Sequence, residues 1–427
     1  MTLQERSDLI LAFARVLFVN GQATEQTLRA AESVGKTLGL RSEIVPRWGE
    51  LQLQAENEEG RFTTRVAAEP ASVNMHCVAS TMQAIGELNA GRCAPEAAPK
   101  ALDAISRAPP APAWLFALAA GAGAVALAVL YGMQHLSSAF IIFASGSGGA
   151  LLRRTLAKHS ENLFVQPFCA SLLAGAIGAF AVRYELSSSL RLIAVCPCMI
   201  LVPGPHVLNG AMDLFNGRIH LGASRLIYAG LVIVAISAGL LLGLDLFDVS
   251  LPVHQGGAGV PLWQDVLAAG VAVASFSIFF SMPGKMLAWP VAVGMLAHAL
   301  RWGTMTMLGS SAAAGAFVAC FVAGLILAPV SHRVHMPFAA IGFAAVVSMM
   351  PGLFLFRTAS GLIQLSGGAH TTLELIGGTV ADGMTAITII LAMSFGLIGP
   401  KLIFDRISRR ATQPQAQRSH GDQGVAE

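Results

Sequence analysis

The sequence predicts an α-helical polytopic membrane protein with about ten transmembrane helices as two five-helix inverted repeats and a small α+β soluble N-terminal domain. Of the 427 residues, 54% are hydrophobic and only 12% are charged, whereas a soluble domain carries about 25% charged residues. The charge is uneven, because residues 1–110 hold 24 of the 51 charged side chains. The apolar remainder also repeats itself. The first quarter of the chain is therefore expected in water and the rest in lipid.

The N-terminal domain, residues 1–110, contains patterns of both helices and strands. Apolar residues recur at helical spacing in four segments and alternate with polar residues in three. The expected helices lie at about 9–20, 24–38, 73–88 and 94–105, and the expected strands at 43–48, 51–56 and 62–66. Pro109, Pro110 and Pro112 then mark the boundary to the membrane part. The amphipathic start, with Glu5 and Asp8, is not a secretory signal peptide, so we expect this domain to stay in the cytoplasm.

The membrane part contains ten apolar segments, several of them short for a span of about 20 residues. They lie at about 113–131, 138–152, 163–182, 192–211, 226–244, 262–281, 286–300, 312–330, 336–355 and 375–398. Five of them form an expected first membrane unit, residues 111–250, and five a second unit, residues 251–404. A polar C-terminal tail, residues 405–427, follows.

The distribution of positive charge supports ten spans with both termini inside. With the N-terminus inside, eleven Lys and Arg residues fall in the inner loops and in the tail as far as Arg410, and four fall outside. The inner residues are Arg153, Arg154, Lys158, Arg218, Arg225, Lys285, Arg333, Lys401, Arg406, Arg409 and Arg410, and the outer ones are Arg183, Arg191, Arg301 and Arg357. We therefore expect a multi-pass protein of the bacterial inner membrane with both termini in the cytoplasm.

Three short matches indicate that the second unit repeats the first. The matches are residues 143–151 with 279–287 at an offset of 136, Pro203-Gly204 with Pro351-Gly352 at 148, and 222–225 with 379–382 at 157. Because each unit has an odd number of spans, the second must enter the membrane upside down relative to the first. Secondary transporters built in this way bind substrate near the membrane midplane, where interrupted helices supply backbone groups.

The two Pro-Gly pairs are the expected helix interruptions. Pro lacks a backbone N–H and Gly tolerates unusual backbone angles, so Pro203-Gly204 and Pro351-Gly352 fit breaks beside a substrate path, the alternative being a kink or a plain helix end. Polar residues follow the first pair at intervals of three or four, namely His206, Asn209, Asp213 and Asn216. They either form one helical stripe along the path or, if an inner loop begins soon after Gly204, lie in water.

Asp382 is the most informative single residue. It lies several residues inside the last span, where a bare carboxylate costs roughly 2.5–3.5 kcal/mol and needs a partner or a cavity. We expect it on the substrate or coupling-ion path, the alternative being a structural ion pair. Its repeat equivalent is Arg225, which is equally explained as a charge at the inner membrane edge. In the second unit, Arg357 follows the Pro-Gly pair.

Other constellations are not expected to carry chemistry. A net charge of +3 without a basic cluster interleaved with aromatic residues argues against nucleic-acid binding. His332 and His335 lack a third metal ligand, and the six cysteines have the spacing of neither a zinc site nor a disulfide framework. The sequence contains no His-Glu-x-x-His motif and no Gly-x-Gly-Asp motif of a membrane aspartyl protease. We therefore expect no metal, no cofactor and no enzymatic activity.

Together, these motifs resemble the threonine/serine exporters of bacteria and fungi. Residues 21–40 and the following strands resemble the soluble N-terminal domain of that family. Its central motif is similar to Val202-Pro203-Gly204-Pro205 through Asn209-Gly210, Asp213-Leu214, Gly217, Gly222 and Ala223-Ser224-Arg225-Leu226, and the motif of its second unit to Met350-Pro351-Gly352. The sequence departs from this pattern at His206, where an apolar residue is expected.

The resemblance implies a secondary transporter, of the antiporter type, that exports threonine and serine by using the proton gradient or the membrane potential. It favours Pro203, Gly204, Asn209, Asp213 and Arg225 as functional residues. The implied partners are a small amino acid or carboxylate, a coupling proton and membrane lipid, and a homo-oligomer is open. Helix N-termini with Arg225 or Arg357 are expected to bind a carboxylate, and Asp382 to bind an ammonium group or carry a proton. Two alternatives are an exporter of a small dicarboxylate such as succinate, and a channel or sensor.

Overall fold

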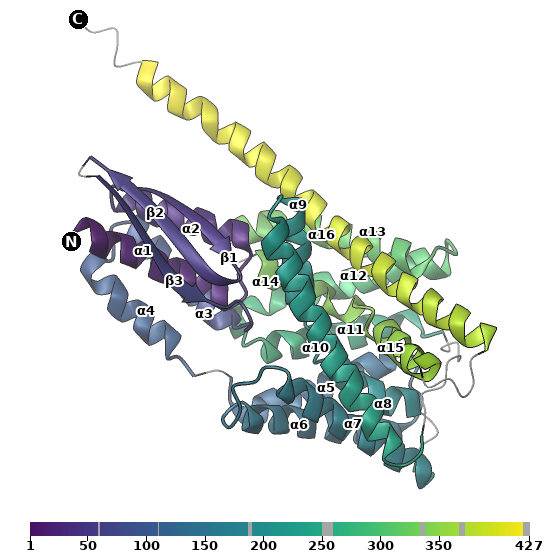
Figure 1. Ribbon diagram of the computed structural model, residues 1–427. Coiled ribbons are helices and arrows are strands. Elements are labelled where there is room, and N and C mark those ends of the chain that lie inside the picture. Colours follow the sequence, from purple (N-terminus) through teal and green to yellow (C-terminus); the bar gives the residue numbers. More distant parts are fainter. Residues whose placement is uncertain are drawn as a thin grey trace, which may run out of the picture.

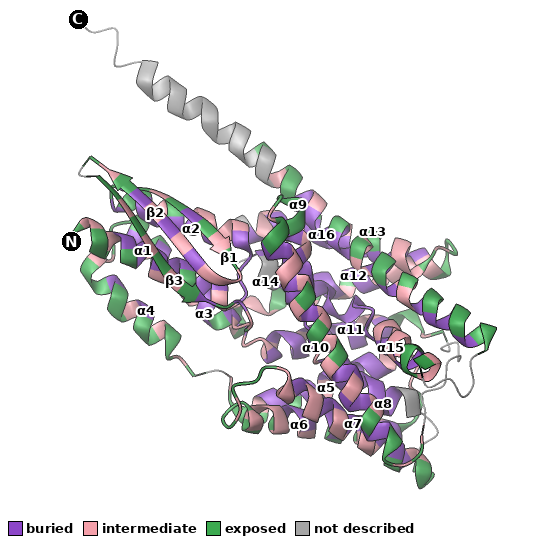
Figure 2. Ribbon diagram, in the orientation of Figure 1, coloured by how far each residue is buried: buried purple, intermediate pink, exposed green. Residues whose placement is uncertain are grey.

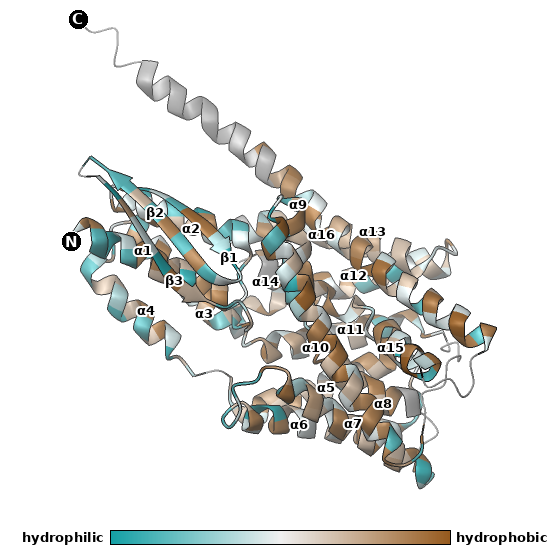
Figure 3. Cartoon of the chain, viewed as in Figure 1, coloured by the Kyte–Doolittle hydropathy of each residue, from teal (hydrophilic) through white to brown (hydrophobic). Residues whose placement is uncertain are grey.

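The protein is described by a computed structural model at residues 1–58, 60–109, 111–186, 190–249, 259–333, 338–366 and 372–421. It is mostly helical and contains one small sheet. In Figure 1 the sheet and the first helices lie at one end of a bundle of longer helices. Figure 3 shows that this bundle is predominantly hydrophobic, whereas the strands carry many hydrophilic residues.

The N-terminal part is an α+β unit. Its elements are α1 (Leu3–Val19), α2 (Thr24–Thr37), β1 (Arg41–Arg47), β2 (Gly49–Asn57), β3 (Gly60–Ala68), α3 (Met75–Asn89), the 3-10 helix η1 (Pro95–Ala97) and α4 (Ala98–Ser106). They confirm the four helices and three strands expected from the sequence. The first helix begins earlier than expected because Thr2 and Glu5 form a capping box, in which each side chain accepts a hydrogen bond from the backbone of the other.

The sheet is an antiparallel meander of order β1-β2-β3. In its register Ile44 lies opposite Leu53, which in turn lies opposite Thr64. Leu51, Leu53 and Ala55 are fully buried on one face of the central strand, as expected for an alternating pattern. Figure 2 shows this alternation along β2. The sheet therefore packs one face on the helices and exposes the other.

The helical part follows as a series of long and short helices. They are α5 (Ala113–Leu130), α6 (Leu136–Leu156), α7 (Val165–Arg183), α8 (Leu190–Met199), α9 (Gly204–Phe215), α10 (Ile219–Asp245), α11 (Leu262–Phe279), η2 (Gly284–Met286), α12 (Ala288–Thr306), α13 (Ala312–Arg333), α14 (Phe338–Val346), η3 (Val347–Met349), α15 (Gly352–Ser366) and α16 (Leu373–Gly421). The first of them, α5, begins directly after the proline-rich boundary.

This part forms a multi-pass membrane protein. Among the described residues, seven helices are long and apolar enough to cross a membrane, and two bent pairs raise the number to nine. The one expected span that is missing from these nine is 286–300. It coincides with α12, which is not apolar enough, so the count of ten is not confirmed. Large apolar side chains such as Leu231, Val234 and Val271 are about half exposed or more. Such contiguous apolar surfaces are typical of contact with lipid.

Both Pro-Gly pairs lie at sharp bends between short helices, which confirms the expected interruptions. The segment 192–199 and α9 meet at 53°, and the helical segment 341–349 meets α15 at 54°. At each bend the Gly is closely packed: a Cβ on Gly204 would collide with Phe343, and one on Gly352 would lie in a tight contact 3.0 Å from Met199. Because Phe343 belongs to α14 and Met199 to α8, each break packs against the other broken pair.

One of the three sequence matches between the units is wrong. Residues 143–151 lie within α6, whereas residues 279–287 run from the end of α11 through a turn into η2. Gly and Ser are too abundant in this chain for such a match to be specific. By order in the chain, α12 corresponds to α6, and an offset of 148 then aligns Gly146 with Gly294 and Arg153 with Arg301.

The packing of α7 on α10 depends on glycine, and so does the packing of α13 on α16. A Cβ on Gly239 of α10 would collide with the Phe168 carbonyl of α7, and one on Gly396 of α16 would lie 2.8 Å from the Phe317 carbonyl of α13. Both helix pairs therefore approach with backbones in contact, as is common where small residues line membrane helices.

We predict that Gly239→Val destabilises the protein, because the added side chain overlaps the backbone of α7. Overpacking of this kind costs about 1–3 kcal/mol. The measurement is the thermal unfolding midpoint of the detergent-purified protein. Gly230→Val on the same helix is the matched control, since no atom lies within 4 Å of a Cβ there. Equal midpoints for the two variants would contradict the packing.

Candidate functional site

A cavity of about 750 Å³ lies between the N-terminal part and the first helix break. Asn20 and residues 71–74 line one side of it. Pro203, Pro205 and His206 line another, so the cavity reaches the beginning of α9. The walls include the N-terminus of α9, whose helix dipole favours an anion. Its first amides are already bonded, since Gly204 N–H donates to the Val202 carbonyl, His206 N–H donates to the Pro203 carbonyl and Pro205 has no N–H.

The lining of the cavity is cationic. Arg153, Arg154 and Lys158 contribute to it, and the residues that line the cavity include neither Asp nor Glu. The Arg154 guanidinium lies 4.5 Å from the Phe116 ring centroid and donates a hydrogen bond to the Ala111 carbonyl. Arg153 lies 5.2 Å from the Phe279 ring centroid, and within the described part of the chain it has no ion pair. The cavity thus offers an arginine to an anionic group.

His206 lies at the junction between this cavity and the N-terminal part. Its ring is buried and meets Tyr228 edge-on, with 5.1 Å between the ring centroids. On its other side Tyr228 contacts Trp48 of the N-terminal part, also at 5.1 Å. Both Tyr228 and His206 line the cavity. The histidine that departs from the family pattern therefore takes part in an aromatic cluster.

Asp213 and Arg225 form a buried ion pair that reaches into the N-terminal part. The Arg225 Nε and the Asp213 Oδ2 are 3.2 Å apart, and the two side chains are 0% and 2% exposed. The Thr24 hydroxyl at the start of α2 donates to the same carboxylate oxygen at 3.0 Å. The guanidinium also lies 5.2 Å from the Phe18 ring centroid of α1. This cluster, Thr24–Asp213–Arg225, joins the N-terminal part to α9 and α10.

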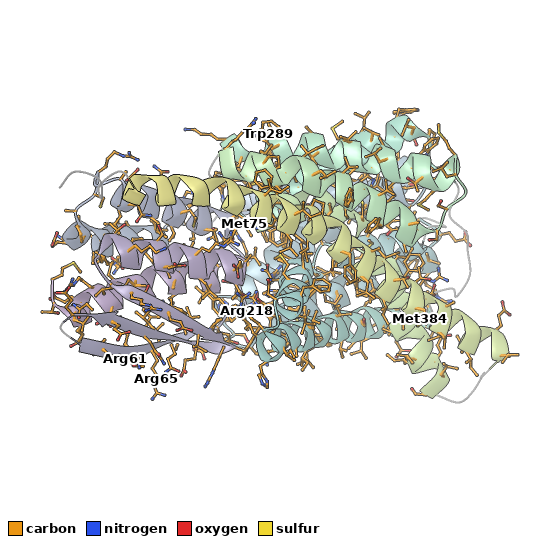
Figure 4. The ribbon with its side chains drawn as sticks, turned by 90° about the horizontal axis from the view of Figure 1, so that it is seen from above. Arg61, Arg65, Met75, Arg218, Trp289 and Met384 are labelled. Carbon is orange, nitrogen blue, oxygen red and sulfur yellow. The ribbon has the colours of Figure 1, made fainter. Side chains whose placement is uncertain are left out.

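A second, partly exposed ion pair extends this contact. Arg218 Nη2 and the carboxylate of Glu25 are 2.6 Å apart, and Glu25 also pairs with Arg29 at 3.2 Å. Burial raises the pKa of Glu25, but the hydrogen bonds and charges of Arg218 and Arg29 outweigh it and hold that pKa below its ordinary value. In Figure 4, Arg218 lies at the junction of the two parts of the molecule.

Hydrogen bonds to the backbone complete the contact. The Asn209 side chain donates to the Gly21 carbonyl at 3.1 Å. The amide of Met75, the first residue of α3, donates to the Phe280 carbonyl after α11 at 2.9 Å. Figure 4 shows Met75 at the same junction. The N-terminal part is therefore bonded to helices from both halves of the helical part.

The polar residues after the second break form a separate ion pair. Arg357 of α15 and Asp382 of α16 lie 2.9 Å apart, with side chains 15% and 11% exposed. In the sequence comparison Arg225 is the repeat equivalent of Asp382. In the structure Asp382 pairs with Arg357, whereas Arg225 pairs with Asp213. Asp382 therefore has the partner that a buried carboxylate needs, and its place on the substrate or ion path stays a prediction.

A third cluster of polar residues was not predicted from the sequence. The His298 Nδ1 lies 3.0 Å from Asp265 Oδ2, and its Nε2 lies 2.8 Å from the Ser348 hydroxyl. All three residues are buried, His298 completely. They come from α11, α12 and η3, so no local spacing relates them. The available signal was a lone Asp in the first turn of α11 and a lone His inside an apolar segment.

The residues proposed from the sequence thus occupy three places. Pro203 and His206 line the cavity, with Gly204 between them at the bend. Asn209, Asp213 and Arg225 contact the N-terminal part and do not line the cavity, while Asn216 is exposed at the end of α9. Pro351, Gly352, Arg357 and Asp382 belong to the second break and its ion pair. Within the described residues no cluster of three metal-ligating side chains occurs.

These features define a multi-pass membrane protein with an α+β part docked at a helix break beside a cationic cavity. The chain belongs to the threonine/serine exporter family: one model of that family matches residues 8–247, and a second one, also of threonine/serine exporters, matches residues 265–403. Between them the two matches cover the N-terminal part and both breaks. The expected family is therefore confirmed.

Two relatives carry corresponding names. A threonine/serine exporter of Corynebacterium glutamicum is 24% identical over 77% of this chain and 66% of its own length. A probable threonine/serine exporter of Mycobacterium tuberculosis is 23% identical over 87% of this chain and 75% of its own length. The chain thus spans slightly less than two thirds of the first relative and three quarters of the second. No solved structure matches the chain.

We predict that Asp213→Asn destabilises the docked N-terminal part, because it leaves the buried Arg225 charge unpaired. Breaking a buried ion pair by removing one partner costs about 3–5 kcal/mol. Thermal unfolding and limited proteolysis of the purified protein measure this loss. Lys36→Gln, which removes only the exposed pair of Lys36 with Glu32, is the control and is expected to cost about 0.2–1 kcal/mol. Equal proteolysis of both variants would contradict the assigned role.

Acid is predicted to weaken the same contact through Glu25. Its folded-state pKa lies below the unfolded one, so its stabilisation is complete above the ordinary glutamate pKa and is lost as the pH falls through the folded-state value. The measurement is the unfolding midpoint of wild type and Glu25→Gln between neutral and acidic pH. The difference between them should be largest at neutral pH and vanish in acid. A difference independent of pH would refute the assignment.

Proposed function

We propose that this protein exports threonine and serine from the cytoplasm and that the cavity at the first helix break is its inner substrate site. The observation that carries the proposal is the position of the cavity, which joins a cationic lining to the N-terminus of a broken helix. The names of the two relatives support the choice of substrate. The direction and the driving force follow the family resemblance.

The chemistry of the lining suits an amino-acid carboxylate. Arg153 supplies a guanidinium, and the beginning of α9 supplies the positive end of a helix dipole. Asn20 and Tyr228 also line the cavity, and their side-chain oxygens are of the kind that accepts hydrogen bonds from an ammonium group. A volume of about 750 Å³ accommodates a small amino acid together with water.

We further propose ten spans in two five-helix units, with α12 as the tenth span and both termini in the cytoplasm. Support comes from corresponding packing: α7 on α10 and α13 on α16 use glycines at equivalent positions. The two breaks also contact each other reciprocally. An odd number of helices per unit then makes the units inverted repeats. The basic residues around the cavity lie beside the N-terminal part, in keeping with the positive-inside rule.

Within this arrangement we assign different roles to the residues singled out in the sequence. Pro203, Gly204 and His206 shape the inner substrate site. Asn209, Asp213 and Arg225 hold the N-terminal part over it, so that this part controls access. Pro351 and Gly352 provide the opposing break. The Arg357–Asp382 pair belongs to the ion path, where an ion pair that opens during transport releases a carboxylate.

A small dicarboxylate such as succinate is the second candidate substrate. The specific observation in its favour is that the cavity is lined by Arg153, Arg154 and Lys158 and by no acidic residue. A dianion gains from such a lining at both ends, whereas the ammonium group of an amino acid is repelled by it. The two candidates differ in charge and are separated by direct measurement.

The test is release of labelled threonine, serine and succinate from preloaded cells with and without the full-length protein. We predict faster release of threonine and serine that a protonophore abolishes. Faster release of succinate alone would favour the second candidate. Unchanged release of all three, from a protein shown to be in the membrane, would refute the exporter assignment for these substrates.

Arg153→Gln is predicted to reduce this release at least tenfold, because a lost charge-assisted contact to a carboxylate is worth about 1.5–3 kcal/mol. Arg183→Gln is the matched control, since this arginine is exposed at the other end of α7 from the cavity-lining residues Gln166 and Pro167. Expression in the membrane is compared by immunoblot. Equal rates for the two variants would remove Arg153 from the substrate site.

A further inference from the structure

Asp265, His298 and Ser348 form a hydrogen-bonded chain that the proposed substrate site leaves unused. Asp265 accepts at one ring nitrogen of His298, and the Ser348 hydroxyl bonds the other. The ring is fully buried, and the three residues join α11, α12 and η3. An ionisable pair inside a membrane bundle is costly and by default indicates function. A chain of this kind is also a path for a proton.

We propose that His298, with Asp265 as its partner, binds the proton that drives the exporter. This inference rests on the proposed function and adds the site of coupling to it. The chemistry is the reversible protonation of an imidazole: a proton entering the site adds to the ring Nε2, while Nδ1–H stays bonded to the Asp265 carboxylate.

The charge of this pair suits a site that alternates between closed and hydrated states during transport. With a neutral imidazole and an ionised Asp265 the pair carries one net negative charge, and with an imidazolium it is neutral. A neutral pair is far less costly to enclose in a low-dielectric bundle than a single charge. Taken by itself, the pair therefore favours closed states when protonated and hydrated states when deprotonated. The positive charge of Arg301, one turn further along α12, acts against the imidazolium and makes the proton easier to release.

Ser348 connects the proton to the second helix break. Beside a neutral imidazole its hydroxyl donates to Nε2, and beside an imidazolium it accepts from Nε2–H, so its own hydrogen must find another acceptor. Ser348 lies in η3, three residues before Pro351, where the chain bends. A change of protonation therefore alters the hydrogen bonding of the short helix that leads into the break.

The position of this group corresponds to that of the cavity in the other unit. Trp114 and Leu118-Ala119-Ala120-Gly121 of α5 match Trp263 and Leu267-Ala268-Ala269-Gly270 of α11 at an offset of 149. At this offset Phe116 of the first unit corresponds to Asp265. At an offset of 148 for the following helices, Ala150 corresponds to His298 and Ile200 to Ser348. Phe116 and Ile200 line the inner cavity. If the units are inverted, the polar group lies where an outer cavity would open. A proton would then enter from the side opposite to the substrate, as antiport requires.

Among the described residues, few other ionisable groups lie near His298. Of the elements that pack on α12, α11 contributes Asp265 and α13 contributes the buried thiol of Cys320. Two further charges on these elements, Lys285 of η2 and Arg333 of α13, are exposed. The described residues of α14, 338–346, contain no ionisable side chain. On α12 itself Arg301 lies one turn further on and acts electrostatically on both His298 and Cys320. His298 and Asp265 are therefore the pair that can exchange a proton within this group.

The test uses purified full-length protein in liposomes with labelled threonine. One assay measures exchange with equal substrate concentrations on both sides and no pH gradient. The other measures accumulation in vesicles with an acidic lumen. A gradient of one pH unit supports up to about tenfold accumulation at one proton per substrate. We expect wild type to do both, and His298→Gln and Asp265→Asn to keep exchange but lose accumulation and its pH dependence.

His220→Gln is the matched control, because this histidine is exposed at the start of α10 and is expected to behave as wild type. Accumulation by His298→Gln equal to wild type would overturn the proton site alone. Loss of exchange together with accumulation in both variants would assign the group a structural role and also overturn it. Exchange without accumulation in wild type would also overturn the proton site, because no coupling to the proton gradient would then exist. Absence of exchange in wild type would overturn threonine export, and the proton site with it.

Discussion

The cost of placing a charge in hydrocarbon is the constraint that organises this protein. Among the described residues of the helical part, the buried acids and their partners form three groups: Asp213 with Arg225, Arg357 with Asp382, and Asp265 with His298. Each group includes a residue on, or bonded to, a helix that adjoins a Pro-Gly break. A bend that is stabilised by charge pairing is also one that a change of charge can move. Packing alone would give the same helices without that sensitivity.

Local patterns were sufficient to predict elements, since elements depend on local physics. Alternation identified β2, helical spacing identified α1 to α4, and the missing N–H of Pro203 and Pro351 identified both breaks. The family followed from motifs around the first break. The number of spans did not follow so simply, because α12 is less apolar than its neighbours and each broken pair divides one segment into two helices.

The partners of the polar residues were beyond the reach of sequence patterns. Thr24 and Asp213 are 189 residues apart, and Asp265 and His298 are 33 apart on different helices. Of the predicted stripe, His206, Asn209 and Asp213 are buried on α9 and Asn216 is exposed, and the neighbour of Asn209 and Asp213 is the N-terminal part. No periodicity reveals which surface a polar stripe faces. The repeat was misaligned at 143–151 for a related reason, since small residues are too common here to fix a register.

The bond from Met75 to Phe280 has a consequence for how the molecule is made. The ribosome releases the N-terminal part first, and it can fold while the rest is still being synthesised. Its docking surface is incomplete, however, until the end of α11 has been inserted, some two hundred residues later. During that interval the Met75 amide and the buried Thr24 and Phe18 surfaces face water or a chaperone. Docking is therefore a late step of biogenesis that reports whether both halves have been inserted.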